Sequence, residues 1–151
     1  DGILFALGEE MRGLLTFVAM MAAMALGADA ARANVQVNVD VGSQTMNVYV
    51  HGQHTYSWHV STGRRGYTTP GGSYRAKRLE RTWYSTIYDG APMPYAVFFR
   101  GGYAIHGTTY VNLLGRPASR GCIRLHPSHA RELFALVRQY GMKQTRITIT
   151  N

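Results

Sequence analysis

The stretch from Asn34 to Val60, NVQVNVDVGSQTMNVYVHGQHTYSWHV, decides the fold. Every second residue between positions 35 and 41 is valine, and the residues between the valines are polar. This period of two is typical of a β-strand with one buried face and one face in solvent. Positions 46–50 and 55–60 repeat the alternation on either side of a turn at HGQH. The stretch therefore predicts three consecutive strands.

More short strands are predicted further along the chain. Residues 61–72 are rich in glycine and contain a proline, which predicts a loop before another short strand. The stretch YAVFFRGGYAIHG, residues 95–107, predicts two apolar strands hinged at a pair of glycines. His106 then lies at the end of the second strand, where its side chain can project from a rigid edge. TRITIT, residues 145–150, predicts a final strand.

One convincing helix is predicted, in HPSHARELFALVRQYG at residues 126–141. Its apolar residues fall at i, i+3, i+4 and i+7, namely Ala130, Leu133, Phe134 and Val137. Pro127 suits the first helical position, with His126 or Ser128 as the N-cap, and Gly141 suits the C-terminal stop. Many short strands and one late helix predict a mainly β fold, either a sandwich or a barrel.

The beginning of the chain predicts export. In residues 11–33, Arg12 precedes an apolar run at 14–26, and small residues with Ala-x-Ala spacing follow at 28–33. These are the features of a cleaved secretory signal peptide, and the run of 13 residues is too short for a membrane span. Residues 1–10 are interpreted as a leader or cloning remnant. We expect residues 34–151 to be one exported domain in the periplasm or cell wall, with no stable membrane span after cleavage.

The exported part of the chain is strongly basic. Residues 34–151 hold 14 of the 16 Lys and Arg residues but only four of the eight acidic ones. Such a charge favours anionic surroundings, which outside the cytoplasm are wall polymers, lipid headgroups or acidic substrates. Nucleic acid is not expected as a partner, because the arginines are scattered and no basic helix, zinc-finger spacing or aromatic RNA-binding motif is present.

Cys122 is the one cysteine of the chain, and it follows His106 by sixteen residues in HGTTYVNLLGRPASRGCIRLH. An unpaired cysteine in an exported protein indicates an intermolecular disulfide or a reactive thiol, and the alternative is a small buried apolar residue. A cysteine nucleophile needs a base, a group that orients the base, and donors for an oxyanion. His106 can be the base, the carbonyl of Gly107 can hold its ring, and Gly121 allows a close approach of substrate to backbone N–H groups.

Two arginines flank the cysteine. We expect Arg120 and Arg124 to lower the pKa of the thiol and to bind a carboxylate. A metal site built from Cys122, His126 and His129 is the other interpretation, but the usual CxxC or HExxH spacing is absent, so neither a metal nor another cofactor is expected. His126 and His129 are interpreted as residues at the start of the helix.

Five segments together resemble the YkuD-type L,D-transpeptidase catalytic domain. They are STG at 61–63, TPGGSY at 69–74, MPYAVFF at 93–99, YAIHGT at 103–108 and SRGCIRL at 119–125. They occur in the order of the family and cover the chain from about residue 35 to residue 149. One departure is Arg120, which stands where the family usually has a second histidine. No second histidine is then expected to share the proton transfer, which depends more on His106.

The resemblance implies a role for each matching residue. Cys122 would be the nucleophile and His106 the proton donor and acceptor, while the Gly107 carbonyl would orient the imidazole. The N–H groups of Gly121 and Cys122 would form the oxyanion hole. The substrate contacts would come from the following four residues: Ser119, Arg120, Arg124 and Tyr95. The aromatic stretch at residues 82–95 would help to exclude water from the site.

The implied reaction is acyl transfer on peptidoglycan stem peptides. Cys122 would form a thioester with the L-centre of a diamino acid, D-Ala would leave, and an amine would resolve the thioester as a cross-link. Three alternatives on the same fold use the same cysteine and histidine: an L,D-carboxypeptidase, a wall amidase, and an enzyme that attaches a lipoprotein to the wall or detaches it. A non-enzymatic wall-binding module would not need the intact set of His106, Gly121 and Cys122.

We predict that the protein, expressed with its leader in a Gram-negative host, accumulates in the periplasm. Because the small residues offer two cleavage positions, its mature N-terminus should be Ala31 or Asn34. Edman sequencing of the periplasmic fraction tests this. Membrane-bound material that still begins at Met11 would contradict the export prediction.

Overall fold

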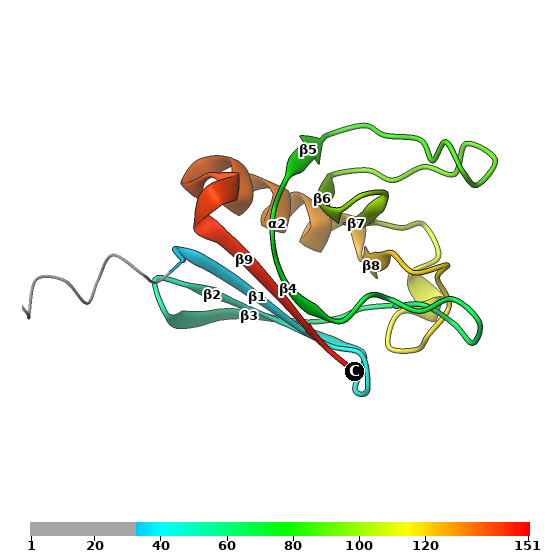
Figure 1. The fold of residues 1–151 in the computed structure, drawn as a ribbon, viewed down its shortest axis with the longest axis horizontal. Coiled ribbons are helices and arrows are strands. Elements are labelled where there is room, and N and C mark those ends of the chain that lie inside the picture. The colour runs from blue at the N-terminus through cyan, green and yellow to red at the C-terminus, as the bar shows by residue number, and fades with distance from the viewer. Residues whose placement is uncertain (1–32) are drawn as a thin grey trace, which may run out of the picture. The chain divides into compact units, whose positions relative to one another are not determined.

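The computed structural model describes residues 33–151, which form two β-sheets and an α-helix (Figure 1). One sheet, here called sheet A, has the order β3-β2-β1-β9-β4, and the other, sheet B, has the order β5-β6-β7-β8. The strands are β1 (Val35–Asp40), β2 (Thr45–Val50), β3 (Gln53–His59), β4 (Gly72–Arg75), β5 (Arg78–Glu80), β6 (Ala96–Arg100), β7 (Tyr103–Gly107), β8 (Ile123–Leu125) and β9 (Thr145–Thr150). Three helices complete the described part, namely α2 (Pro127–Tyr140) and the 3-10 turns η2 (Val111–Leu113) and η3 (Met142–Gln144).

Sheet A begins with the three strands predicted from the opening stretch. β1 pairs antiparallel with β2, and β2 pairs antiparallel with β3 through a two-residue turn. His51 and Gly52 make that turn with φ of 50° and 79°, the left-handed values that two-residue hairpins require. The twist of such a turn matches the twist of the strands that it joins, so the local sequence favours this hairpin.

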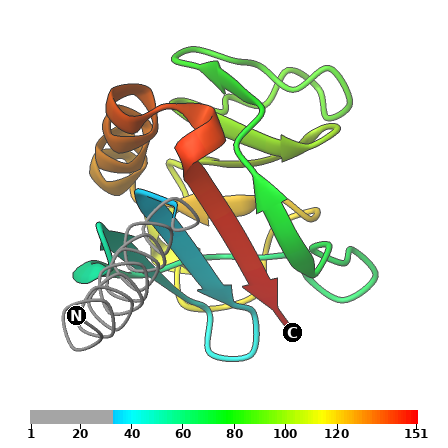
Figure 2. The same cartoon turned by 60° about the vertical axis from the view of Figure 1, so that its left-hand side comes forward.

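The other edge of β1 pairs with the last strand of the chain. β9 runs parallel to β1 in the register Val35↔Thr145, and β4 then pairs antiparallel with β9 (Figure 2). A parallel pair needs a long crossover connection, which here contains sheet B and α2. The first and last strands are therefore joined in the middle of sheet A, and the site residues lie in the connection between them.

The main core lies between sheet A, one face of sheet B and α2. Fully buried residues come from alternate positions of the strands, as in Val35, Val37, Val39, Met46, Val48, Ile147, Ile149, Val97, Phe99, Ile105, Ile123 and Leu125. Alternation puts successive side chains on opposite faces of a strand, so these positions form one continuous apolar layer. The mainly β fold with one late helix is confirmed for the described residues.

The helix α2 forms where the sequence predicted it. The four predicted apolar residues are the buried face of α2, and Pro127 is its first residue. The side chain of His126 accepts a hydrogen bond from the N–H of Ser128, so His126 is the N-cap. Gly141 ends the helix with a φ of 93°, where a residue with a Cβ is disfavoured.

Sheet B has a second apolar face, which points away from the main core. Its residues form a smaller cluster, namely Met93, Ala96, Phe98 and Ala104, with Trp83 and Cys122 packed against it. Sequence neighbours therefore separate: Ile105 belongs to the main core, whereas Ala104 belongs to the smaller cluster. The one cysteine lies on this second face.

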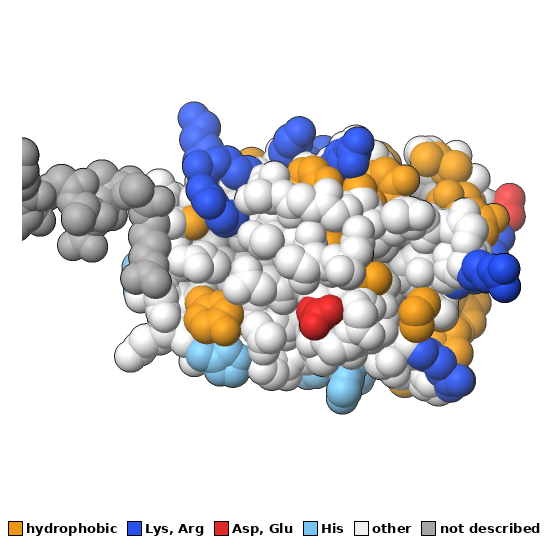
Figure 3. All heavy atoms as spheres, turned by 60° about the horizontal axis from the view of Figure 1, so that its bottom comes forward, with side chains coloured by type: hydrophobic (Ala, Val, Ile, Leu, Met, Phe, Trp, Pro, Cys, Tyr) orange, Lys and Arg blue, Asp and Glu red, His pale blue; other side chains and the backbone are white. Residues whose placement is uncertain are grey.

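The two N-terminal predictions, the leader remnant at 1–10 and the signal peptide at 11–33, fall almost entirely outside the described residues. Within residues 33–151, no helix has the length and apolar character needed to cross a membrane. On the face drawn in Figure 3, Lys and Arg side chains lie in several separate groups near the rim. This distribution agrees with the scattered arginines of the sequence and forms no continuous basic stripe on that face.

Candidate active site

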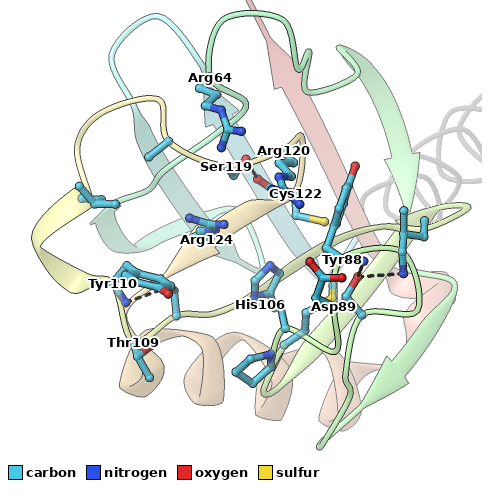
Figure 4. Close-up of a pocket in the computed structure, with 18 of the residues that line it drawn as sticks. Arg64, Tyr88, Asp89, His106, Thr109, Tyr110, Ser119, Arg120, Cys122 and Arg124 are labelled. Carbon is cyan, nitrogen blue, oxygen red and sulfur yellow. Dashed lines mark hydrogen bonds between the residues drawn. The ribbon is translucent and has the colours of Figure 1, made fainter.

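The pairing of β7 with β8 brings the predicted catalytic residues together. The two strands are parallel, with His106 opposite Arg124. Residues that are partners in a sheet share a face, and so do residues two apart on one strand. Cys122 precedes Arg124 by two residues, so Cys122, Arg124 and His106 all lie on the same face of sheet B. Figure 4 shows the imidazole of His106 and the Sγ atom of Cys122 directed into one cavity.

His106 is held in one orientation by the backbone. Its Nδ1 lies 2.7 Å from the carbonyl oxygen of Gly107, and its side chain is 6% exposed. A carbonyl oxygen only accepts, so Nδ1 carries the proton and Nε2 is left with a free lone pair. The pKa of His106 is lowered to about 4: burial is the largest cause, the Gly107 hydrogen bond opposes it, and the nearby Arg124 adds a smaller lowering. The ring is therefore a neutral base at physiological pH.

Cys122 is protonated in the same pH range. Burial raises the pKa of the thiol, which outweighs the lowering by the Ala104 backbone and by Arg124. The Sγ atom lies 3.8 Å from the carbonyl oxygen of Gly102, to which the thiol can donate. Arg124 does lower this pKa, as expected, but burial is the larger effect and the pKa of the thiol is raised. The resting pair is a neutral thiol beside a neutral imidazole.

Ser119, which is 1% exposed, holds the loop before β8 in place through hydrogen bonds to Gly121 and Cys122. Its hydroxyl donates to the carbonyl oxygen of Cys122 at 2.6 Å and accepts from the N–H of Gly121 at 3.0 Å. Ser119 thus ties both residues of the predicted oxyanion hole and lies on the cavity wall. The N–H of Gly121 is engaged within the protein, which does not fit its predicted role as an oxyanion donor. The N–H of Cys122 stays the predicted donor.

The cavity in front of the cysteine has a volume of about 550 Å³ (Figure 4). Three guanidinium groups line it, from Arg64, Arg120 and Arg124. Each of the three lies over an aromatic ring: Arg64 at 4.7 Å from the centre of Tyr67, Arg120 at 4.7 Å from that of Tyr88, and Arg124 at 5.9 Å from that of Tyr110. Within residues 33–151 none of the three arginines forms an ion pair, since the one salt bridge there joins Arg78 to Glu80. The guanidinium groups of the cavity wall can therefore bind anionic groups of a ligand.

Asp89 is the one acidic residue on the cavity wall within the described chain. It stands in a tight turn with Gly90, with φ of 47° and 67° for the two residues, a conformation that Asp-Gly favours. The turn belongs to the loop between β5 and β6, which carries Tyr88 as well. In Figure 4 the carboxylate of Asp89 points into the cavity. The cavity therefore has guanidinium groups on its walls together with a single carboxylate.

Three predicted substrate residues line the cavity, but Tyr95 does not. Ser119, Arg120 and Arg124 are on its wall, whereas the ring of Tyr95 packs edge-on against Phe134 of α2 at 5.7 Å. Tyr95 has a φ of 55°, and this backbone turns its side chain toward the main core. Its predicted contact with substrate does not fit this position. The neighbouring residues Pro92 and Met93 of the same stretch do reach the cavity.

Arg64 and Asp89 were not singled out from the sequence. Arg64 follows the STG segment directly, and its N–H donates to the carbonyl oxygen of Ser119 at 2.9 Å. That contact joins residues 55 positions apart, which no local pattern indicates. The Asp-Gly pair at 89–90 is the one sequence signal that could have marked the second residue, as a turn within the aromatic stretch.

The two histidines at the start of α2 have structural contacts. His126 caps the helix, and the ring of His129 stacks on Trp58 at 4.9 Å with an interplanar angle of 7°. No group of three or more His, Cys, Asp or Glu side chains that could hold a metal ion occurs in the described chain. Their interpretation as residues of the helix start agrees with these contacts.

Comparison with protein-family models gives one match, to the L,D-transpeptidase catalytic domain YkuD over residues 34–149. The chain belongs to the YkuD family. Its mainly β fold with one late helix matches that of solved L,D-transpeptidases. A comparison with curated protein sequences finds no match.

Several solved L,D-transpeptidases share the YkuD fold of this chain. The protein from Stackebrandtia nassauensis is 26% identical with a TM-score of 0.67, and the match covers 80% of this chain and 57% of that one. An L,D-transpeptidase from Mycobacterium tuberculosis is 22% identical with a TM-score of 0.68, covering 78% and 58%. L,D-transpeptidase 3 of the same organism, solved with a faropenem-derived adduct, is 20% identical with a TM-score of 0.67, covering 78% and 60%. The match thus spans somewhat under two thirds of the length of these solved proteins.

We expect Gly121→Ala to damage the site more than its backbone strain alone explains. Gly121 has a φ of +115°, and a Cβ there would lie 2.7 Å from the ring of Tyr103. Gly66→Ala is the matched control, because Gly66 has a φ of +86° and nothing within 4 Å of the added Cβ. Both variants should lose about 1 kcal/mol of unfolding free energy from strain. Only Gly121→Ala should lose more than that and also lose reactivity at Cys122. Equal losses in chemical denaturation would contradict the close approach at Gly121.

The pKa values of the pair predict how alkylation of Cys122 depends on pH. Between about pH 6 and pH 8 the thiol is below its raised pKa and His106 is already neutral, so the thiolate fraction should grow about tenfold per pH unit. The rate of reaction with iodoacetamide, followed by intact mass, should grow with the same slope. A rate that levels off below pH 7 would instead indicate a thiolate paired with an imidazolium in the resting protein.

Proposed function

We propose that this domain transfers an acyl group from peptidoglycan stem peptides to an amine, through a thioester on Cys122. One observation supports this most strongly: a buried imidazole with a free Nε2 shares a cavity with the one thiol of the chain. Membership of the YkuD family gives the reaction class. No cofactor is needed, since acyl transfer requires only a nucleophile, a base and an oxyanion donor.

In the first step the thiol of Cys122 attacks the carbonyl carbon of the L-centre of a diamino acid. The Nε2 atom of His106 takes the thiol proton as the S–C bond forms, and the carbonyl oxygen becomes an oxyanion near the N–H of Cys122. The imidazolium then gives its proton to the nitrogen of the D-residue as the C–N bond breaks. D-Ala leaves as a neutral amine, and an acyl thioester remains on Cys122.

In the second step an amine of a neighbouring stem peptide attacks the thioester. His106, which is neutral again, takes a proton from the attacking nitrogen, and the collapse of the tetrahedral adduct expels the thiolate. The thiolate recovers its proton from the imidazolium, and the product carries a new amide bond. The low pKa of His106 keeps the imidazole unprotonated before each step and makes its imidazolium a strong proton donor.

The charges on the cavity wall fit both reactants. Arg64, Arg120 and Arg124 are free of ion pairs in the described chain, and planar guanidinium groups can bind the carboxylates of a stem peptide in pairs of hydrogen bonds. The acceptor amine is a cation before it reacts, and Asp89 is the carboxylate that can hold it at the cavity. A water acceptor would need no such anionic group. This arrangement favours an amine over water as the acceptor.

The strongly basic domain and the predicted signal peptide agree with action at an anionic cell wall outside the cytoplasm. We propose stem peptides of peptidoglycan as the partner of the domain. Hydrolysis by an L,D-carboxypeptidase or wall amidase, and attachment or detachment of a lipoprotein, would use the same thioester. The products of the reaction distinguish these alternatives.

Incubation of residues 34–151 with disaccharide-tetrapeptide should give cross-linked dimers joined between two diamino acids, together with free D-Ala. Cys122→Ser should abolish both products, because His106 ionises a hydroxyl far less readily than a thiol. Arg124→Ala should reduce substrate use more than it reduces alkylation by neutral iodoacetamide. Mass spectrometry of the muropeptides measures each product. Tripeptide monomers alone, even with excess acceptor, would show a carboxypeptidase.

Asp89→Asn should shift the products from cross-linked dimers toward tripeptide monomers. Asp89 is exposed, and the loss of its ion pair with the acceptor should lower the ratio of dimer to monomer by up to about fivefold. Formation of the thioester, followed as D-Ala release, should change little, because the donor step does not use the carboxylate. Glu132→Gln, an exposed acid on α2, is the matched control. An unchanged ratio would remove Asp89 from acceptor binding.

A further inference from the structure

Thr69 is a buried residue near the active site that the mechanism has not used. It is 3% exposed and is not on the wall of the cavity. Its hydroxyl accepts from the N–H of Gly63 at 2.9 Å and donates to the carbonyl oxygen of Gly121 at 2.9 Å. The accepted bond commits the hydroxyl proton to Gly121, since the N–H of Gly63 can only donate. Thr69 thus links the loop after β3 to the residue immediately before the nucleophile.

The bond to the Gly121 carbonyl controls the direction of the next N–H. The peptide between Gly121 and Cys122 is trans and planar, so its carbonyl and its N–H point in opposite directions. Thr69 holds the carbonyl on its own side, and the N–H of Cys122 therefore points away from Thr69. A glycine with a φ of +115° has few steric restraints of its own, so this peptide depends on its hydrogen bonds for orientation.

Gly63, which donates to Thr69, follows Thr62, and Thr62 is fixed to the turn between β1 and β2. The side chain of Gln44, which is buried, donates to the Oγ1 atom of Thr62 at 2.5 Å and accepts from the N–H of Thr62 at 2.9 Å. The carbonyl oxygen of Thr62 in turn accepts from the N–H groups of Ala118 and Ser119 at 3.0 and 2.9 Å. A path of hydrogen bonds therefore runs from the turn between β1 and β2 to the loop that carries Cys122, beside the separate link that Thr69 makes.

We infer that Thr69 is a positioning residue that aims the N–H of Cys122 at the oxyanion formed during acylation. This inference rests on the proposed function, because it assumes that Cys122 attacks a carbonyl. Thr69 touches no substrate and acts through the peptide of Gly121. The engaged N–H of Gly121 increases the dependence on the N–H of Cys122, since Ser119 already occupies the other predicted donor.

Two reagents separate this role from a merely structural one. A carbapenem is attacked at its ring carbonyl: the S–C bond forms, the ring C–N bond breaks, and the thiol proton ends on the ring nitrogen. That reaction passes through an oxyanion, as does attack on a stem peptide. Iodoacetamide is attacked at its CH₂ group, the C–I bond breaks, and iodide and a proton are released without any oxyanion. Loss of the oxyanion donor therefore slows the first reaction and not the second.

The experiment measures both rates on residues 34–151 by intact mass, for the wild type and three variants. Thr69→Val replaces the hydroxyl with a methyl group and should slow carbapenem acylation by about 10²-fold, while alkylation changes less than about twofold. Thr69→Ser keeps the hydroxyl and should restore most of the acylation rate. Thr145→Val is the matched control, because Thr145 is also buried and its hydroxyl donates to Gly141, at the end of α2. It should leave both rates unchanged.

Thermal melting checks that each variant is folded. If the Thr69→Val protein does not fold, Thr69→Ala removes the same hydroxyl without adding a methyl group in its place. Equal slowing of both reactions, or unchanged acylation in a folded variant without the hydroxyl, would overturn the inference. A wild-type protein that is alkylated but never acylated would refute the proposed function itself, and the inference with it.

Discussion

The parallel register of β7 with β8 is the constraint on which the site depends. It places His106 beside Arg124 and, because side chains alternate along a strand, puts Cys122 on the same face. A shift of one residue would turn either the histidine or the cysteine into the main core and would expose Ile105 or Ile123 instead. The burial of those isoleucines therefore stabilises the register and, through it, the placement of His106 and Cys122 on one face. The register that buries Ile105 and Ile123 in the core is thus the same register that places His106 and Cys122 on one face.

Burial decides the protonation of the pair. Both groups are more stable uncharged, since desolvation lowers the pKa of His106 and raises that of Cys122. The nearby guanidinium of Arg124 lowers the pKa of both groups. It therefore favours the charged form of Cys122 and disfavours the charged form of His106. In the resting protein both groups are therefore uncharged. A neutral thiol is also a poor target for oxidants.

Local signals in the sequence predicted most of the fold. The valine alternation gave β1, the apolar spacing with its cap gave α2, and the glycine pair gave the turn between β6 and β7. The parallel pairing of β1 with β9 could not be predicted, because it joins strands more than a hundred residues apart and leaves no local pattern. At the site, His106, the Gly107 carbonyl and Cys122 came from the motif, whereas Tyr95 and the Gly121 N–H were misplaced. Those two depend on a backbone angle and a hydrogen bond that residue types do not specify.

The two faces of sheet B have separate apolar clusters, and this has a consequence for how such a domain can diversify. Residues of the main core serve every strand, so few substitutions there are tolerated. The smaller cluster packs Trp83 and Met93, from the loop between β5 and β6, against β6, β7 and the thiol. Changes in that loop would therefore act first on the smaller cluster. Because the same loop carries Tyr88 and Asp89 to the cavity wall, its variation can reshape the cavity without replacing His106 or Cys122.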